Sequence, residues 1–474
     1  MELNKLTIKE AGALLQTKKI SAVELTKACL EQIKKLDGDI KACLTVCEKE
    51  ALAAATAADV RLAAGETGAL LGIPCLIKDN MMTAGIRTTA ASKMLENYVA
   101  PYNATVISRL KDAGAVILAK TNMDEFAHGA STETSAFQIT KNPYDLSRVP
   151  GGSSGGSAAG VAADMCIFAL GSDTGGSIRQ PASFCGIFGL KTSYGRVSRH
   201  GLMSMTSSTD TIGPLTKTAE DAALVLQVIA GPDNFDSTAN SSTPENYLAK
   251  ISDSVKGLKI GLPKEYFPET LNSEVRALIM AQVEILRAAG AEIVDVSLPY
   301  TKYGVPVYYI ITPCEISSNL ARLDGLRYGY FDKSAVNLAE IYAKNRGGGF
   351  GAEAKRRIMV GTYALSAGYY DAYYKKANKV RMMIARDFTK VFSEVDILLT
   401  PTTPTPAFKI GEKIDDPITM YLEDIFVSGP SLAGLPAISV PAGKINNLPL
   451  GLQLIGQKMG EAELLRVANF LDKK

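Results

Sequence analysis

The sequence predicts an α/β protein in which a mixed β-sheet core is covered by helices on both faces. Short apolar runs typical of buried strands recur along the 474 residues, and segments with helical periodicity alternate with them. Residues 272–289, for example, predict a helix directly before the strand-like run 293–296. Alternation of this kind favours a mixed sheet between two layers of helices.

The individual elements follow from start signals and apolar runs. Thr7 with Glu10 and Ser21 with Glu24 have the spacing of capping boxes and predict two amphipathic helices, while Asn103 is expected to begin a third helix that Gly114 ends. A helix of small residues is expected over 158–163, and the polar stretch 231–245 is the expected long surface loop. Strands are expected within 70–77 and at 115–119, 166–170, 258–261, 293–296, 395–399, 437–440 and 450–455.

Composition limits the classes of function. Neither an internal repeat nor a convincing linker divides the chain, so residues 1–474 are expected to form one domain. The formal charge of +2 is evenly spread, unlike the basic footprint of a protein that grips nucleic acid by itself. Without a membrane-length apolar run or a secretory segment, we expect a cytoplasmic protein with no membrane contact. The seven cysteines are then expected to be reduced core residues, and no metal-ligand spacing occurs among them and the two histidines.

Two clusters of serine and glycine, residues 151–157 (GGSSGGS) and 171–177 (GSDTGGS), predict nucleophilic chemistry. A hydroxyl nucleophile needs a proton acceptor within reach and backbone N–H donors aimed at the developing oxyanion. Glycine lets the backbone approach a ligand closely. Lys78 ends the strand-like run 70–77, and a lysine carried inward on a strand can lose its charge and accept a proton.

Other interpretations of these segments are weaker. A Gly/Ser string is often a flexible linker, but here it runs directly into a small-residue helix and a strand. A phosphate-binding loop would need a Gly-Lys-Ser/Thr ending, which neither cluster has. A Ser-His-Asp hydrolase is the runner-up, although His128 and His200 lie in turn-like surroundings and are expected to be structural. Lys78 taken alone would more often be a surface or salt-bridged lysine.

Together, Lys78 and the segments 151–157 and 171–181 resemble the amidase signature family, with 75 residues from Lys78 to Ser153 and 24 from Ser153 to Ser177. The resemblance implies a Ser-cisSer-Lys triad in which Ser177 is the nucleophile, Ser153 relays the proton from a cis peptide and Lys78 is the base. It also implies an oxyanion hole from the N–H groups of Thr174, Gly175, Gly176 and Ser177. Ser154, Asp173 and Arg179 are expected to support the two loops.

Five further segments are informative: 122–126 (NMDEF), 193–199 (SYGRVSR), 355–359 (KRRIM), 366–374 (SAGYYDAYY) and 432–436 (LAGLP). They are similar to one branch of that family, the A subunits of tRNA-dependent amidotransferases. This resemblance implies a protein that hydrolyses glutamine and passes ammonia to a partner, which amidates Glu-tRNA(Gln). Subunits B and C are the implied partners; the B subunit would bind the acylated tRNA and use ATP and Mg²⁺, so no cofactor or metal is implied for this chain.

The same resemblance assigns the substrate pocket. Arg357 and Asp424 would bind the α-carboxylate and α-ammonium of glutamine, with Tyr308 as a neighbour. The string 355–357 is also compatible with a plain solvated helix face. His128 and residues 209–211 depart from the branch's pattern, which leaves a stand-alone amidase with another small-amide substrate as the alternative. A non-catalytic scaffold is disfavoured because all three triad residues are present.

Overall fold

A computed structural model describes residues 1–474 and contains one mixed sheet of 11 strands. The strand order is β1-β3-β2-β4-β6-β5-β10-β11-β9-β7-β8. Strand β2 is parallel to β3 and β4, and β7 is parallel to β8 and β9, while the other pairs are antiparallel. The strands are β1 (Cys43–Val46), β2 (Pro74–Lys78), β3 (Val116–Thr121), β4 (Phe168–Asp173), β5 (Phe188–Lys191), β6 (Thr211–Thr216), β7 (Lys259–Pro263), β8 (Glu292–Val296), β9 (Ile397–Pro401), β10 (Ala437–Ile445) and β11 (Leu448–Gly456).

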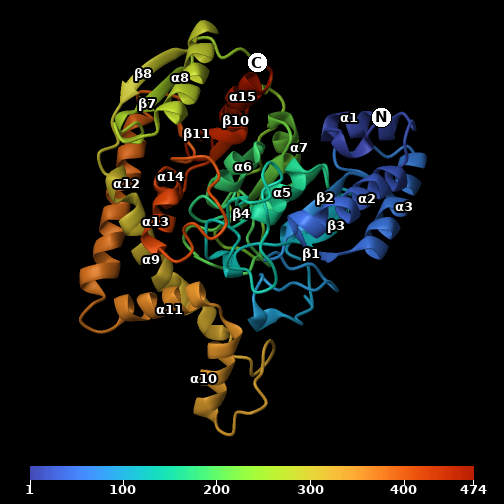
Figure 1. Cartoon of the computed structure of the whole chain (residues 1–474). Helices are drawn as coiled ribbons and strands as arrows, with labels where there is room; N and C mark the ends of the chain where they lie inside the picture. The colour runs from blue at the N-terminus through green and yellow to red at the C-terminus, as the bar shows by residue number, and fades with distance from the viewer.

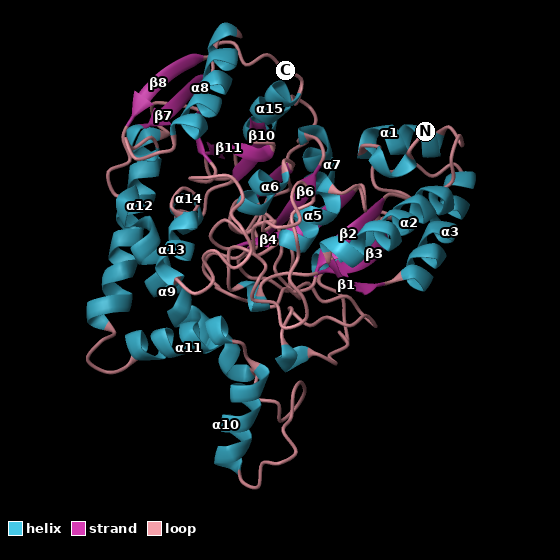
Figure 2. Cartoon of the chain, viewed as in Figure 1, coloured by secondary structure: helices cyan, strands magenta, loops and turns pink.

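Helices surround this sheet, and one of them, α10, projects from the body of the molecule (Figure 1). Coloured by secondary structure, the chain shows long loops gathered at one side of the sheet, between the strands and α11 (Figure 2). The helices are α1 (Ile8–Gln16), α2 (Ala22–Ile40), α3 (Glu48–Ala63), α4 (Thr105–Asp112), α5 (Gly155–Ala162), α6 (Arg179–Cys185), α7 (Ala219–Ile229), α8 (Ser273–Ala288), α9 (Gly304–Asn319), α10 (Leu338–Gly349), α11 (Ala352–Leu365), α12 (Lys376–Val391), α13 (Pro417–Tyr421), α14 (Ser428–Leu432) and α15 (Glu461–Asp472).

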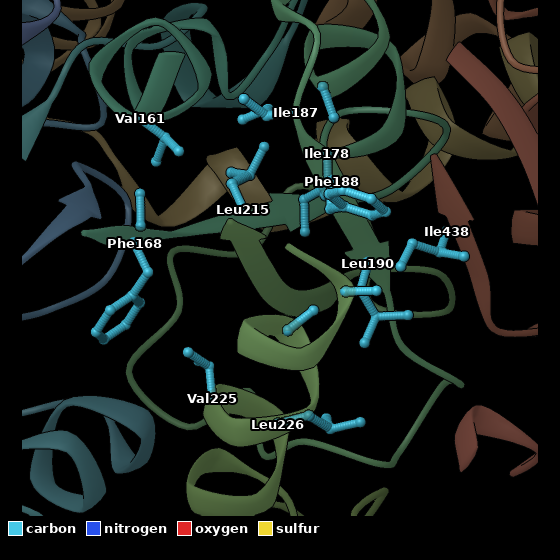
Figure 3. Close-up of a cluster of buried hydrophobic side chains, with 14 of the residues drawn as sticks. Val161, Phe168, Ile178, Ile187, Phe188, Leu190, Leu215, Val225, Leu226 and Ile438 are labelled. Atoms are coloured by element: carbon cyan, nitrogen blue, oxygen red, sulfur yellow. The ribbon is translucent and has the colours of Figure 1, made fainter. Parts of the chain in front are cut away.

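The centre of the core lies between α5 and α7, with the middle strands between them. Figure 3 shows Val161 of α5 on one side of the strands and Val225 and Leu226 of α7 on the other. Both faces of strand β4 are buried, and the strand begins with consecutive apolar residues from Phe168. A strand buried on both faces has a continuous hydrophobic run, which is why its position was predictable from the sequence.

Most expected elements are confirmed. Both capping boxes are present, and α8 begins after its N-cap Asn272 as predicted. Asn103 is not the cap of α4, because Ala104 holds that position and the Asn103 side chain accepts a hydrogen bond from the backbone of Ala84.

Strands β1, β5 and β6 were not predicted from the sequence, and they cover only four to six residues each. Strand β1 has only four residues, and β5 and β6 carry glycine, proline, threonine or lysine between their apolar residues, so each strand depends on pairing with strands elsewhere in the chain. All seven cysteines are buried and unpaired. No helix has the length and apolar character needed to cross a membrane.

Candidate active site

Three segments that carry the predicted triad meet at one edge of the sheet. Strands β2 and β4 are parallel neighbours, with Ile77 paired to Leu170, so their carboxyl ends lie side by side. Lys78 is the last residue of β2, and the loop that holds Ser177 follows the end of β4. The loop of Ser153 precedes α5, which packs against both strands. The topology therefore brings the three residues together from distant parts of the chain.

The amine of Lys78 is completely buried among hydroxyl groups. Its Nζ lies 2.8 Å from Ser153 Oγ, 2.8 Å from Ser154 Oγ and 2.9 Å from Ser172 Oγ. No carboxylate lies within ion-pair distance of it.

Burial lowers the pKa of Lys78 to about 7, and the more distant carboxylates of Asp124, Asp173 and Asp210 offset this shift only in part. A substantial fraction of Lys78 is therefore neutral near pH 7 and able to accept a proton.

The serines around Lys78 differ in what their hydroxyl protons do. Ser154 Oγ donates to the Ser172 carbonyl at 3.1 Å, so toward Lys78 it acts as an acceptor. The Ser153 hydroxyl is hydrogen-bonded to the Lys78 amine, so Ser153 can exchange its proton with that amine. The Gly152–Ser153 peptide bond is cis, as the resemblance to the amidase signature family implies. The Ser154 N–H also donates to the Ser177 carbonyl at 3.1 Å and so ties the two loops together.

The loop of Ser177 presents backbone donors. Ser177 is 7% exposed, whereas Lys78 and Ser153 are completely buried. The N–H of Gly176 donates to Asp173 Oδ1 at 2.8 Å, so this member of the expected oxyanion hole is already engaged. The N–H groups of Thr174, Gly175 and Ser177 have no acceptor within the protein. Gly176 has a φ of +132°, and a Cβ there would clash with the Val427 side chain, so the loop requires glycine at this position.

Asp173 and Arg179 hold this loop as a buried ion pair. Arg179 Nη2 lies 2.9 Å from Asp173 Oδ1, and its Nε donates to Oδ2 at 3.0 Å. Arg179 also reaches Gln453 and Ser431. Although burial alone would raise it, the pKa of Asp173 is lowered to about 2, chiefly by Arg179. These contacts agree with the supporting role expected for the pair.

Tyr308 and Asp424 stand against the same loop. A Cβ added at Gly175 would clash with the Tyr308 ring, and one added at Gly176 would lie 3.6 Å from Asp424 Oδ1. The two side chains therefore wall the space next to Ser177. Burial raises the pKa of Asp424 to about 7, while Tyr309 and Arg357 act in the opposite direction.

Arg357 is 3% exposed, so the solvated-face interpretation of residues 355–357 is wrong for this residue. Its Nε donates to Glu353 Oε1 at 2.7 Å, and its guanidinium lies over the rings of Tyr309 and Tyr421. It lines a cavity of about 330 Å³ that also reaches Glu125, Glu133 and residues 129–131. Neither Nη group of Arg357 makes a hydrogen bond, so both are available to a ligand.

Four residues near the site were missed by the sequence analysis. Tyr309 OH donates to Asp424 Oδ2 at 2.7 Å, and Tyr421 OH donates to Glu353 Oε1 at 2.9 Å. Asp210 accepts from Thr174 Oγ1 at 2.7 Å, so the departing string 209–211 contacts the loop of Ser177. The four-residue spacing of Glu353 and Arg357 on one helix was a readable signal. The other contacts join segments far apart in the sequence and left no such signal.

The two histidines take no part in this arrangement. Neither forms a hydrogen bond with Ser153, Ser154 or Ser177. His128 is completely buried, and both of its ring nitrogens lack a hydrogen-bond partner. Burial, together with the nearby charge of Arg357, holds the pKa of His128 well below its usual range. No group of three or more His, Cys, Asp or Glu side chains is arranged to hold a metal ion.

The chain is similar in sequence to known proteins over its whole length. Residues 24–465 match the family model described as Amidase. The chain is 57% identical to the A subunit of glutamyl-tRNA(Gln) amidotransferase from Carboxydothermus hydrogenoformans over 474 residues, which cover 100% of this chain and 98% of that protein. It is 53% identical to the protein of the same name from Geobacillus thermodenitrificans, with 98% of this chain and 96% of that protein covered.

The chain is also similar in structure to solved proteins over nearly its whole length. The crystal structure of the A subunit of glutamyl-tRNA(Gln) amidotransferase from Thermotoga maritima is similar with a TM-score of 0.82 and 44% identity, covering 99% of this chain and 94% of that chain. The native peptide amidase from Stenotrophomonas maltophilia is similar with a TM-score of 0.81 and 30% identity, covering 98% and 96%. The chain therefore belongs to the amidase family, in its branch of glutamyl-tRNA(Gln) amidotransferase A subunits.

Proposed function

We propose that this chain is the glutaminase subunit of the Glu-tRNA(Gln) amidotransferase, acting as one amidase domain over residues 1–474. The observation that carries the proposal is the 2.8 Å contact between Lys78 Nζ and Ser153 Oγ in a buried pocket that holds no counter-ion for the lysine. A base of this kind beside a nucleophile loop suits amide hydrolysis. The identity of 57% to a protein named as an amidotransferase A chain supports glutamine as the amide.

In the proposed mechanism, Ser177 Oγ attacks the side-chain carboxamide carbon of glutamine. Its proton passes to Ser153 Oγ while the Ser153 proton passes to neutral Lys78. The lysine then returns a proton through Ser153 to the departing nitrogen, which leaves as ammonia. Water attacks the resulting glutamyl ester by the same relay and releases glutamate, which regenerates Ser177.

The tetrahedral intermediates carry a negative oxygen that needs donors. The N–H groups of Thr174, Gly175 and Ser177 are the ones without protein acceptors, and we assign the oxyanion hole to them. The Gly176 N–H contributes indirectly, because its bond to Asp173 fixes the loop. Loss of one such donor typically costs about a hundredfold or more in rate.

Substrate selection is proposed to rest on charge. Arg357 would bind the α-carboxylate through its free Nη groups, and Asp424 would bind the α-ammonium, with Tyr308 closing the space over Gly175. Asp424, whose pKa burial raises to about 7, is stabilised as an anion when the substrate brings a positive charge next to it.

The ammonia would pass to a partner. We propose that the chain works in the cytoplasm with subunits B and C, that the B subunit binds Glu-tRNA(Gln) and uses ATP and Mg²⁺ to activate it, and that this chain holds neither cofactor. The net charge of +2 supports placing most of the tRNA contact on the partner.

A stand-alone amidase is the second candidate. A peptide amidase with 30% identity has a similar structure, so the same fold also occurs in an enzyme with a different name. The two candidates differ in their substrates. A stand-alone amidase would turn over a neutral amide such as propionamide as well as glutamine, and it would be indifferent to partner subunits.

The test is Ser177→Ala in the assembled amidotransferase. We expect glutamine-dependent formation of Gln-tRNA to be lost, while formation from free ammonium is kept, because only the glutaminase step uses this serine. Loss of both activities would make Ser177 structural. A wild-type preference for propionamide over glutamine, unchanged by the partners, would overturn the amidotransferase assignment in favour of the stand-alone amidase.

A further inference from the structure

The two residues proposed to clasp glutamine are joined by a continuous chain of side chains. Glu353 contacts Arg357, Tyr421 contacts Glu353, and Tyr309 stacks on Tyr421 and reaches Asp424. Helices α9 and α11 and the segment that contains α13 supply these groups. None of the three linking residues reacts in the proposed mechanism.

Glu353 fixes one edge of the Arg357 guanidinium. Its Oε1 accepts from Arg357 Nε at 2.7 Å, which leaves the edge with the two Nη groups free. A guanidinium binds a carboxylate best through two parallel N–H groups, so the edge that remains is suited to that task. Burial disfavours the charge of Arg357, but the nearby Glu353 more than offsets this and keeps the pKa of Arg357 above its usual value.

Tyr421 holds Glu353 in turn and carries the chain to the other anchor. The Tyr421 hydroxyl donates to the same Oε1 at 2.9 Å. The rings of Tyr309 and Tyr421 stack with centroids 3.7 Å apart, and Arg357 lies 5.2 Å from the centroid of Tyr309. The Tyr309 hydroxyl then donates to Asp424 Oδ2 at 2.7 Å. The stacked rings of Tyr309 and Tyr421 thus connect the cation of Arg357 to the anion of Asp424.

We propose that Glu353, Tyr421 and Tyr309 form a positioning frame that sets Arg357 and Asp424 at the separation of the two α-groups of a free amino acid. The inference rests on the proposed function. The frame selects a substrate that carries both a carboxylate and an ammonium on one carbon. Amides that lack these groups, including a glutamine side chain within a peptide, gain nothing from it.

The kinetic test uses Glu353→Gln and Tyr421→Phe in the full chain, alone and with its partner subunits. Each variant is assayed with glutamine and with propionamide, which presents a carboxamide without the α-groups. We expect KM for glutamine to rise about tenfold in Glu353→Gln and about threefold in Tyr421→Phe, with kcat/KM for propionamide within about twofold of wild type.

The controls are Glu284→Gln, which removes an equivalent charge from an exposed pair with Arg287, and Tyr342→Phe, which removes an exposed hydroxyl. Both should leave the two substrates unchanged. In an Arg357→Ala background, Glu353→Gln should add no further loss on glutamine, because it acts through Arg357.

The Tyr309→Phe variant allows a second measurement, the pH dependence of kcat/KM, which would not change if Tyr309 were merely structural. The Tyr309 hydroxyl favours the ionised form of Asp424, so its removal should raise the pKa of Asp424 further. The fall of kcat/KM for glutamine at acid pH should therefore move to higher pH, while the fall of kcat/KM for propionamide stays at the same pH.

The outcomes separate the frame from the function. If Arg357→Ala abolishes the preference for glutamine but Glu353→Gln and Tyr421→Phe do not weaken it, the frame is refuted and the glutaminase stands. Equal losses on both substrates would also refute the frame, because they indicate general disruption. If wild type shows no preference for glutamine over propionamide, the proposed function itself fails.

Discussion

Two buried lysines on neighbouring strands have opposite surroundings. Lys78 ends β2, and Lys120 lies in β3, where it pairs in register with Ile77. Both are 0% exposed. Lys120 Nζ lies 3.3 Å from Asp79 Oδ1 and donates to the Met81 carbonyl at 2.8 Å, whereas Lys78 contacts serine hydroxyls and, at 3.4 Å, one carbonyl.

Burial alone does not make a lysine a base. Burial lowers the pKa of both amines, but at Lys120 the adjacent carboxylate of Asp79 works against the shift. Asp79 follows Lys78 directly in the chain, yet it turns to Lys120 and to Thr89. Lys78 is thereby left without a counter-ion and with a pKa of about 7. One lysine has a structural environment and the other has the environment of a proton acceptor.

The largest effect is expected at Lys78. Lys78→Ala and Lys78→Arg should each lower glutaminase kcat by about a hundredfold to ten-thousandfold, because alanine has no acceptor and arginine does not release its proton. Circular dichroism would check that both variants fold. Substantial glutaminase activity in Lys78→Arg would contradict the role of Lys78 as base.

A smaller effect, on stability, is expected at the other lysine. Asp79→Asn leaves Lys120 buried without its carboxylate, and breaking a buried pair in this way typically costs about 3–5 kcal/mol. Urea unfolding should therefore show a lower midpoint. Lys120→Met, which removes the charge and keeps the volume, should lower the stability of the Asp79→Asn variant less than it lowers that of wild type. Stability unchanged in Asp79→Asn would show that the pair is not a structural one.

The smallest effect is expected at a third buried base, His128. Its ring nitrogens are both buried and unpartnered, and a buried polar side chain left unsatisfied typically costs about 1–3 kcal/mol. His128→Met replaces the ring by an apolar side chain of similar size, so thermal unfolding should occur at a higher temperature. A lower unfolding temperature would mean that the ring makes contacts that outweigh this penalty.

Some parts of the molecule were predictable from the sequence alone, and others were not. Strands buried on both faces, such as β2 and β4, and capped helices such as α8 were predictable because local signals determine them. The meeting of Lys78 with Ser153 rested on a family resemblance, since 75 residues separate them. Tyr309 and Tyr421 could not be found, because their importance arises from a ring stack between segments that are distant in the chain.

The role of Lys78 as the base can be tested by measuring the protonation of its amine. The full chain, labelled with ¹³C at lysine Cε, can be titrated by NMR, and the Lys78 signal identified by its absence in Lys78→Met. A midpoint near the pKa of about 7 is predicted, with the neutral amine present above it. A Lys78 signal that stays protonated until above about pH 9, as for an ordinary lysine, would contradict the claim that this residue is the base.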